Sequence, residues 1–169
     1  MILDATCSIK RIWPKVADVR MDISPLAHPD VVGDCKRLPF ADESFDSVYC
    51  DPPHLTGKAG IKRVMDPQKT TPTFARYSRF ENPAAWIRFV HAATNEFYRV
   101  LKPHGFLRWK LPDGSRSHGT MVHYADAFDP RFGTVADISV PSKGPFSRLN
   151  VVRGHRPCMI HYLTLEKIC

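Results

Sequence analysis

Four short apolar runs in the first third of the chain each close on an aspartate, and this pattern constrains the fold more than any other feature. The runs predict buried strands at residues 1–5, 17–23, 30–34 and 45–50, which end at or near Asp4, Asp22, Asp34 and Asp51. One such aspartate is typical of a helix cap or a turn. Four in succession indicate a functional site, because ligands of open α/β sheets bind at the carboxyl ends of the strands.

A long helix is predicted to begin at Asn82 and Pro83, because Asn is favoured at the N-cap and Pro at the first helical position. Its apolar face is predicted to comprise Trp86, Phe89, Val90, Ala93, Phe97, Val100 and Leu101. The segment KPHG, residues 102–105, is predicted to end this helix.

The remainder of the chain is predicted to be rich in strands. A fifth strand is expected at 105–111, a short helix around 117–128, and two final strands at 134–140 and 158–165. Strands that alternate with helices or loops in this way favour an α/β fold with a parallel sheet and a β-rich C-terminal end.

The length and composition narrow the class of protein. A chain of 169 residues predicts one domain, 1–169, with one core. No window is apolar and long enough for a membrane span, and the first residues lack the features of a signal peptide. The five cysteines form no C-x-x-C pair, so no metal site is expected, and reduced thiols in the cytoplasm are expected.

Two basic segments stand out against the net charge of +7, which on its own leaves a polyanionic partner and no such partner about equally open. Segment 55–80 has no clean period and is predicted to be a long substrate loop. Its proposed substrate-binding residues are Lys58, Lys62, Arg63, Arg76, Tyr77 and Arg79. Segment 141–156 is predicted to be a basic hairpin loop beside it. The alternatives are a solvated loop pinned by its aromatic residues and a plain exposed hairpin.

The segment DPPH, residues 51–54, follows directly on the fourth predicted strand. Proline fixes its own φ and restricts the residue before it, so the Asp51 carboxylate and the Pro52 carbonyl are held in place. The alternative is an ordinary proline turn, with His54 as a surface residue. Lys110 and Asp113 stand at the end of the fifth predicted strand and could reach the same site. The alternative is that they are ordinary charges at the end of a strand.

These landmarks resemble the class I S-adenosylmethionine-dependent methyltransferases, and among them the enzymes that methylate exocyclic amino nitrogens of nucleic-acid bases. The stretches ILDATCS, RMDI and VVGDCKRLPFADESFDSVYCDPPH are similar to that family's first four motifs, and EFYRVLKPHGFLRWKL is similar to the stretch that follows. The resemblance implies a Rossmann-like fold with a mostly parallel seven-stranded sheet and a C-terminal antiparallel hairpin. It also implies S-adenosyl-L-methionine as the cofactor.

The resemblance implies a role for each matching position. The methionine end of the cofactor would be held by Asp4, Ala5, Thr6, Cys7 and Ser8, and the last four of these replace the usual glycines of the first motif. Asp22 would accept hydrogen bonds from the ribose hydroxyls, and Asp34 with the Cys35 amide would bind adenine. The catalytic residues would be Asp51, Pro52, Pro53 and His54, with His54 in place of the usual Tyr, Phe or Trp.

The corner at 51–54 suits methyl transfer to an aromatic amine, whose lone pair is delocalised into the ring. Two acceptors, the Asp51 carboxylate and the Pro52 carbonyl, would draw the nitrogen towards tetrahedral geometry, and His54 would stack on the base. The favoured target is adenine N6 in DNA or RNA. The alternatives are guanine N2 in RNA, a protein glutamine or small amine, and a non-catalytic methyltransferase-like nucleic-acid-binding subunit.

The expected partner is therefore a nucleic acid, with no membrane partner. Because 169 residues leave little room for a separate target-recognition domain, a homodimer or a heteromeric recognition subunit is a further expectation.

Overall fold

The structure is a computed structural model, and it describes residues 1–7, 17–52, 80–112, 127–141 and 159–168. In chain order the elements are β1 (Ile2–Asp4), β2 (Val19–Asp22), η1 (Pro25–Ala27), β3 (Val31–Val32), β4 (Phe45–Cys50), α2 (Pro83–Val100), β5 (Leu101–Pro112), β6 (Phe132–Pro141) and β7 (Met159–Lys167). The predicted strands at the N-terminal half, the long helix and the two final strands are all present. The expected short helix around 117–128 lies mostly outside the described residues, and residues 127–128 form a turn.

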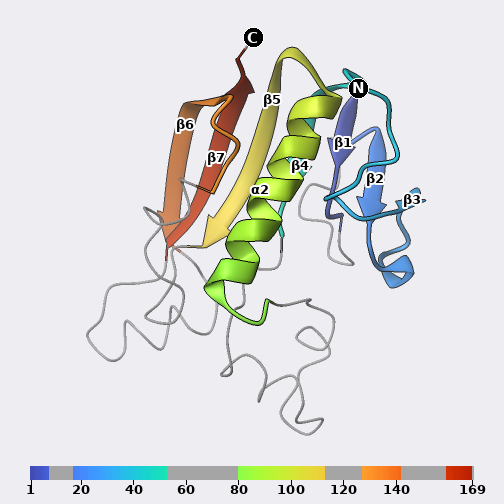
Figure 1. The fold of residues 1–169 in the computed structure, drawn as a ribbon, viewed down its shortest axis with the longest axis horizontal. Helices are drawn as coiled ribbons and strands as arrows, with labels where there is room; N and C mark the ends of the chain where they lie inside the picture. Colours follow the sequence, from blue (N-terminus) through green and yellow to red (C-terminus); the bar gives the residue numbers. More distant parts are fainter. Residues whose placement is uncertain (8–16, 53–79, 113–126, 142–158, 169) are drawn as a thin grey trace, which may run out of the picture.

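The strands form one seven-stranded sheet in the order β3-β2-β1-β4-β5-β7-β6, shown in Figure 1. The pairs β1–β2, β2–β3, β1–β4 and β4–β5 are parallel, whereas β7 runs antiparallel to both β5 and β6. This confirms the expected mostly parallel sheet with a C-terminal antiparallel hairpin. The order reverses between β1 and β4, and the carboxyl ends at such a switch point are where α/β sheets bind ligands.

Helix α2 lies across one face of the sheet, in front of β4 and β5 (Figure 1). Its start is fixed by Asn82, whose side-chain oxygen accepts a 2.8 Å hydrogen bond from the Ala85 backbone N–H. The predicted apolar face is confirmed: Trp86, Val90 and Phe97 are at most 2% exposed. The ring of Phe97 packs edge-on against Trp109 of β5, with centroids 6.1 Å apart.

The start of β5 differs from the sequence-based expectation. The strand begins at Leu101, directly after α2, and KPHG is an irregular part of it, not a turn before it. The pairing with β4 jumps from Phe45↔Leu101 to Ser47↔Phe106, and His104 adopts a φ of 60° within the extra residues. The helix already ends at Val100, so the proline and glycine of KPHG interrupt the strand, where they lie in a bulge.

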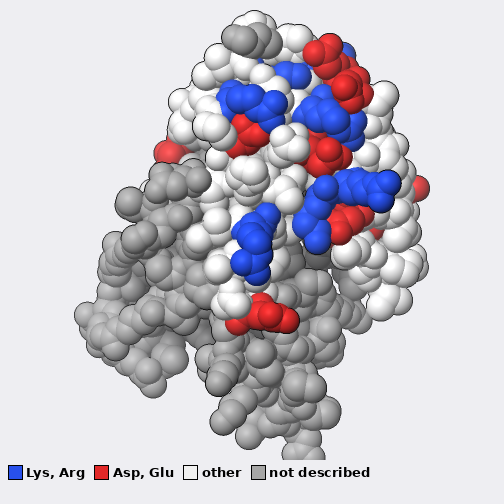
Figure 2. Space-filling view, viewed as in Figure 1, with Lys and Arg blue, Asp and Glu red and all other residues white. Residues whose placement is uncertain are grey.

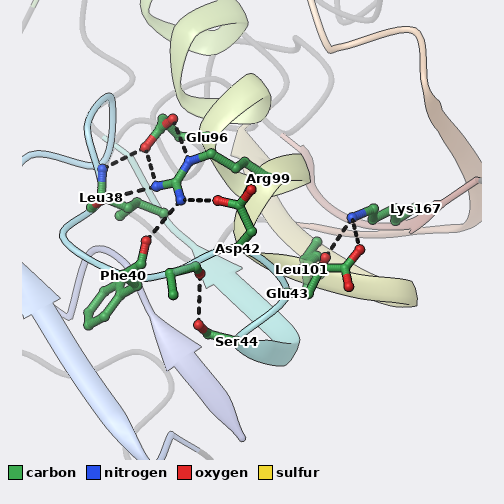
Figure 3. A network of polar contacts seen from close by, with 10 residues as sticks. Leu38, Phe40, Asp42, Glu43, Ser44, Glu96, Arg99, Leu101 and Lys167 are labelled. Atoms are coloured by element: carbon green, nitrogen blue, oxygen red, sulfur yellow. Dashed lines mark hydrogen bonds and ion pairs between the residues drawn. The ribbon is translucent and has the colours of Figure 1, made fainter.

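The loop before β4 is anchored to α2 by Arg99, as Figure 3 shows. Its guanidinium donates to the carbonyls of Phe40 (2.8 Å) and Leu38 (3.1 Å) and to the carboxylates of Asp42 (2.7 Å) and Glu96 (2.8 Å). Glu96 also accepts a 2.8 Å bond from the Leu38 backbone N–H. These contacts fix where β4 enters the sheet and therefore where it ends.

Candidate active site

The carboxyl ends of the parallel strands β1, β4 and β5 lie together along one side of the sheet, which is called the carboxyl edge, or this edge, below. Asp4, the last residue of β1, pairs with Tyr49 of β4, and Cys50 of β4 pairs with Trp109 of β5. Asp51 follows Cys50, so it lies one step beyond this ladder, beside Lys110 of β5. The register of the sheet thus brings together charges that are far apart in the sequence.

Asp4 is almost fully buried, with 1% of its surface exposed. Its Oδ1 accepts a hydrogen bond of 3.2 Å from the Thr6 backbone N–H. Burial raises the pKa of Asp4 to about 6; the Thr6 bond opposes this rise, and the negative charges of Asp51 and Asp22 add to it. Asp4 is therefore close enough to Asp51 and Asp22 to be repelled by both, and a cation bound here would relieve that repulsion.

The residues after Asp4 extend the sheet instead of forming an open glycine turn. The backbone N–H of Ala5 donates to the Tyr49 carbonyl (2.9 Å), and that of Cys7 donates to the Met21 carbonyl (3.0 Å). Ala5 and Cys7 are at most 2% exposed. Their small side chains fit this crowded position between β4 and β2.

Thr6 joins the two candidate motifs. Its hydroxyl oxygen accepts a 2.7 Å hydrogen bond from the Asp51 backbone N–H. The segment after β1 therefore holds the first residue of the DPPH corner directly, which the sequence alone did not indicate.

The Asp51 carboxylate forms an ion pair with Lys110, whose Nζ lies 2.9 Å from Oδ2. The two side chains are only 8% and 15% exposed, respectively. Burial raises the pKa of Asp51, and the Lys110 charge and hydrogen bond limit that rise. Pro52 is buried beside this pair. Of the two interpretations of Lys110 that the sequence offered, a residue that reaches the site and an ordinary strand-end charge, the contact with Asp51 favours the first.

The other predicted cofactor residues lie at the ends of β2 and β3. Asp22 ends β2, and its Oδ1 accepts from the Ser24 backbone N–H at 2.9 Å. Asp34 follows β3 by two residues and pairs with Lys36 at 3.4 Å. Cys35 is buried, and burial raises the pKa of its thiol to about 12, so it is a neutral apolar group here.

One exposed apolar residue at this edge is not among the candidate site residues that the sequence indicated. Ile23 directly follows Asp22 and is 61% exposed. Its position after a strand-end acid is the sequence signal that would have identified it.

Several predicted residues lie outside the described part of the chain: Ser8, Pro53, His54, Lys58, Lys62, Arg63, Arg76, Tyr77 and Arg79. Their placement in the site stays a prediction.

The charge of the protein is divided unevenly along the chain. The described residues hold ten of the 24 Lys and Arg but fourteen of the 17 Asp and Glu, a net charge of −4, so the other segments carry +11. In Figure 2 the cations of the described residues mostly lie next to acids on the face shown. The pairs Arg99–Glu96 and Arg131–Asp129 are examples. The positive charge is concentrated in 8–16, 53–79 and 142–158, which carry +3, +5 and +4, whereas 113–126 carries −1.

The sheet order, with an antiparallel seventh strand between the fifth and sixth, is that of the class I methyltransferases, and acids stand at the carboxyl ends of its strands. No family model matches the chain, and no curated protein matches it. In contrast, solved structures match the chain, and the three described below each cover 99% of it.

Three of these structures illustrate the different activities named among the matches. The geranyl diphosphate methyltransferase solved with GPP and sinefungin has a TM-score of 0.62 at 10% identity, with 71% of that chain covered. The N-methyltransferase NodS from Bradyrhizobium japonicum WM9 has a TM-score of 0.57 at 11% identity, with 85% covered. The [4+2]-cyclase SpnF has a TM-score of 0.61 at 12% identity, with 75% covered. These similarities establish the fold, and because one of them is a cyclase, the fold alone does not fix the reaction.

Within the described residues, no helix is long and apolar enough to cross a membrane.

Proposed function

We propose that this protein is an S-adenosylmethionine-dependent methyltransferase that modifies an exocyclic amino nitrogen of a nucleic-acid base, with adenine N6 as the favoured target. The observation that carries the proposal is the buried Asp51 carboxylate at the end of β4, 8% exposed and followed by Pro52, at the same edge as the buried Asp4. A carboxylate held in this position can accept a hydrogen bond from an amine.

The acids at this edge fit S-adenosylmethionine. Besides the Asp51–Lys110 ion pair, Asp4 and Asp22 give the edge a negative charge, which suits a ligand with a sulfonium and an ammonium group. Asp22 would accept from the ribose hydroxyls, and the exposed Ile23 beside it would cover an apolar ring face. When bound, the cofactor supplies a methyl group whose carbon–sulfur bond breaks as the new nitrogen–carbon bond forms.

The residues of the chain orient the amine and stabilise its developing charge. Asp51 and the Pro52 carbonyl accept from the two N–H groups, and this draws the nitrogen lone pair out of the ring. The proton leaves to solvent after methylation, when the nitrogen is acidic, so a strong base is not needed. Thr6 positions Asp51 through its 2.7 Å contact with the backbone.

The distribution of charge favours a nucleic acid over a small amine as the substrate. The three basic segments, 8–16, 53–79 and 142–158, follow the carboxyl ends of β1, β4 and β6 in the sequence. Because β1, β4 and β5 are parallel and β6 is parallel to β5, all three of these strand ends lie at the edge that contains Asp51. We propose that cations of these segments, Lys58, Lys62, Arg63, Arg76 and Arg79 among them, bind phosphates.

The test is transfer of a labelled methyl group from S-adenosylmethionine to pools of DNA, RNA and protein, followed by nucleoside and amino-acid analysis. We expect label in N6-methyladenine and none with Asp51→Ala. Label in guanine or in protein would overturn the target and keep methyl transfer. Cofactor binding by calorimetry without transfer to any pool would overturn catalysis and favour a nucleic-acid-binding subunit.

A further inference from the structure

The pair formed by Asp51 and Lys110 lies on the face of the sheet opposite to α2. Cys50 and Trp109 are paired across β4 and β5, and Trp109 packs against Phe97 of α2. Side chains alternate between the two faces of a strand. The next residue on each strand, Asp51 and Lys110, therefore points away from the helix, and the 2.9 Å contact between them agrees with this.

This ion pair presents a hydrogen-bond acceptor beside a donor. Among the contacts of the described residues, Lys110 Nζ donates to Asp51 Oδ2 alone, although an ammonium group carries three N–H donors. Asp51 Oδ1 accepts no bond from the described residues. The carboxylate therefore retains an acceptor and the ammonium retains donors, side by side at the end of two adjacent strands.

A purely catalytic role does not explain an ammonium in this position. During methylation, positive charge develops on the substrate nitrogen next to Asp51, and a second cation a few ångströms away opposes that charge. A lysine that is only 15% exposed also carries a desolvation penalty. A hydrogen bond from Lys110 to the substrate before the reaction would offset the desolvation cost and would give the ammonium a role other than stabilising the developing charge.

We infer that Lys110 is a specificity-determining residue, which donates a hydrogen bond to a ring nitrogen adjacent to the amino group that Asp51 accepts. This inference rests on the proposed function. Adenine presents such an edge, with the N6 amino donor next to the N1 acceptor, and cytosine presents N4 next to N3. On the Watson–Crick edge of guanine the amino group stands next to the N1–H donor, which would face the donor of Lys110, and the N3 acceptor lies on the sugar edge instead. For a base that presents its Watson–Crick edge, the pair therefore selects adenine or cytosine over guanine.

The test removes either half of the proposed contact. The probes are single-stranded 12-mers of thymidine with one central adenine or one 1-deazaadenine, and matched RNA 12-mers of uridine. The analogue keeps the amino group and replaces N1 by CH. Affinity is measured by fluorescence anisotropy, and kcat and KM are measured by methyl transfer.

For the wild type we expect 1-deazaadenine to lower kcat/KM and affinity by about 10- to 100-fold, as for one charged hydrogen bond. Lys110→Met should lose most of this discrimination and raise KM for adenine more than it lowers kcat. Lys110→Arg, which keeps donors, should restore part of it. Lys102→Met is the matched control, because Lys102 lies at the opposite end of β5, is exposed, and pairs with Asp46.

The outcomes separate the two claims. If the wild type methylates both probes equally, or if Lys110→Met discriminates as well as the wild type, the role of Lys110 is wrong while methyl transfer stands. If the wild type neither binds nor methylates any probe, the proposed function fails, and the role of Lys110 fails with it. A thermal unfolding curve for each variant distinguishes loss of the contact from loss of the fold.

Discussion

The backbone N–H of Asp51 donates a 2.7 Å hydrogen bond to the hydroxyl of Thr6, so the end of β4 is attached to the segment that follows β1. Thr6 stands where the resembling enzymes carry a glycine-rich turn. A residue in the segment after β1 therefore positions Asp51, the first residue of the proposed catalytic corner, and the two segments are joined directly.

Thr6→Val keeps the shape of the side chain and removes the acceptor. We expect turnover to fall about tenfold, roughly the loss of one hydrogen bond that orients Asp51, and cofactor affinity to change much less. Thr6→Ser keeps the hydroxyl and serves as the control. Equal turnover in Thr6→Val and Thr6→Ser would show that the contact does not position Asp51.

Asp22 and Asp51 should separate binding from catalysis. Asp22→Ala removes the proposed ribose acceptor, and we expect S-adenosylmethionine to bind about tenfold or more weakly by calorimetry. Asp51→Ala should abolish turnover while the heat of cofactor binding is largely kept. If Asp22→Ala bound the cofactor as tightly as the wild type, the ribose role would be wrong.

Much of this site could be anticipated from the sequence, because strand ends are marked by simple signals. Apolar runs closed by Asp4, Asp22 and Asp51 located the ends of β1, β2 and β4 correctly. The Asn82–Pro83 signal located the start of α2, since capping depends on local chemistry alone.

The contacts between strands could not be predicted, because the register of a sheet depends on how two strands pair and not on the sequence of either strand alone. Lys110 reaches Asp51 only because β5 is bulged after Leu101, which shifts the pairing with β4. The sequence predicts that the segment KPHG, residues 102–105, ends the helix, whereas in the structure it lies in that bulge. Thr6 similarly gained its role from the parallel pairing of β1 with β4.

The raised pKa of Asp4 predicts a specific pH dependence of stability. Its folded-state value is about 6, whereas the ordinary value is 3.8, so the folded protein binds this proton more tightly than the unfolded chain. The wild type should therefore lose stability as pH rises through the window from about 4 to 6. Asp4→Asn cannot ionise and should lack this component.

At pH 7 we expect Asp4→Asn to be more stable than the wild type, by about 3 kcal/mol at most, and at pH 4 the difference should nearly vanish. Urea unfolding of both proteins at several pH values measures it. The same substitution should weaken cofactor binding, because it removes negative charge from the site. If the difference in stability did not change with pH, the pKa of Asp4 would not be raised by folding.

Association with nucleic acid should depend steeply on salt if the basic segments meet phosphates. The logarithm of the binding constant should fall linearly with the logarithm of salt concentration, with a slope that counts the neutralised phosphates. Arg76→Gln together with Arg79→Gln should reduce that slope by about two for double-stranded DNA. Arg88→Gln, on the exposed side of α2, is the control. An unchanged slope in the double variant would exclude those two arginines from phosphate contact.

Gly105 tests the bulge that sets the register of β5. A Cβ added there would lie 2.9 Å from the Lys102 carbonyl oxygen and 3.2 Å from the Asp46 carbonyl oxygen, both backbone atoms that cannot move away easily. Gly105→Ala should therefore destabilise the protein by about 1–3 kcal/mol and disturb the Asp51–Lys110 pair further along the strand. Gly133→Ala is the matched control, because its Cβ would meet the end of the flexible, exposed Ile168 side chain. Urea unfolding measures both, and equal effects of the two substitutions would mean that close backbone approach at Gly105 does not fix the bulge.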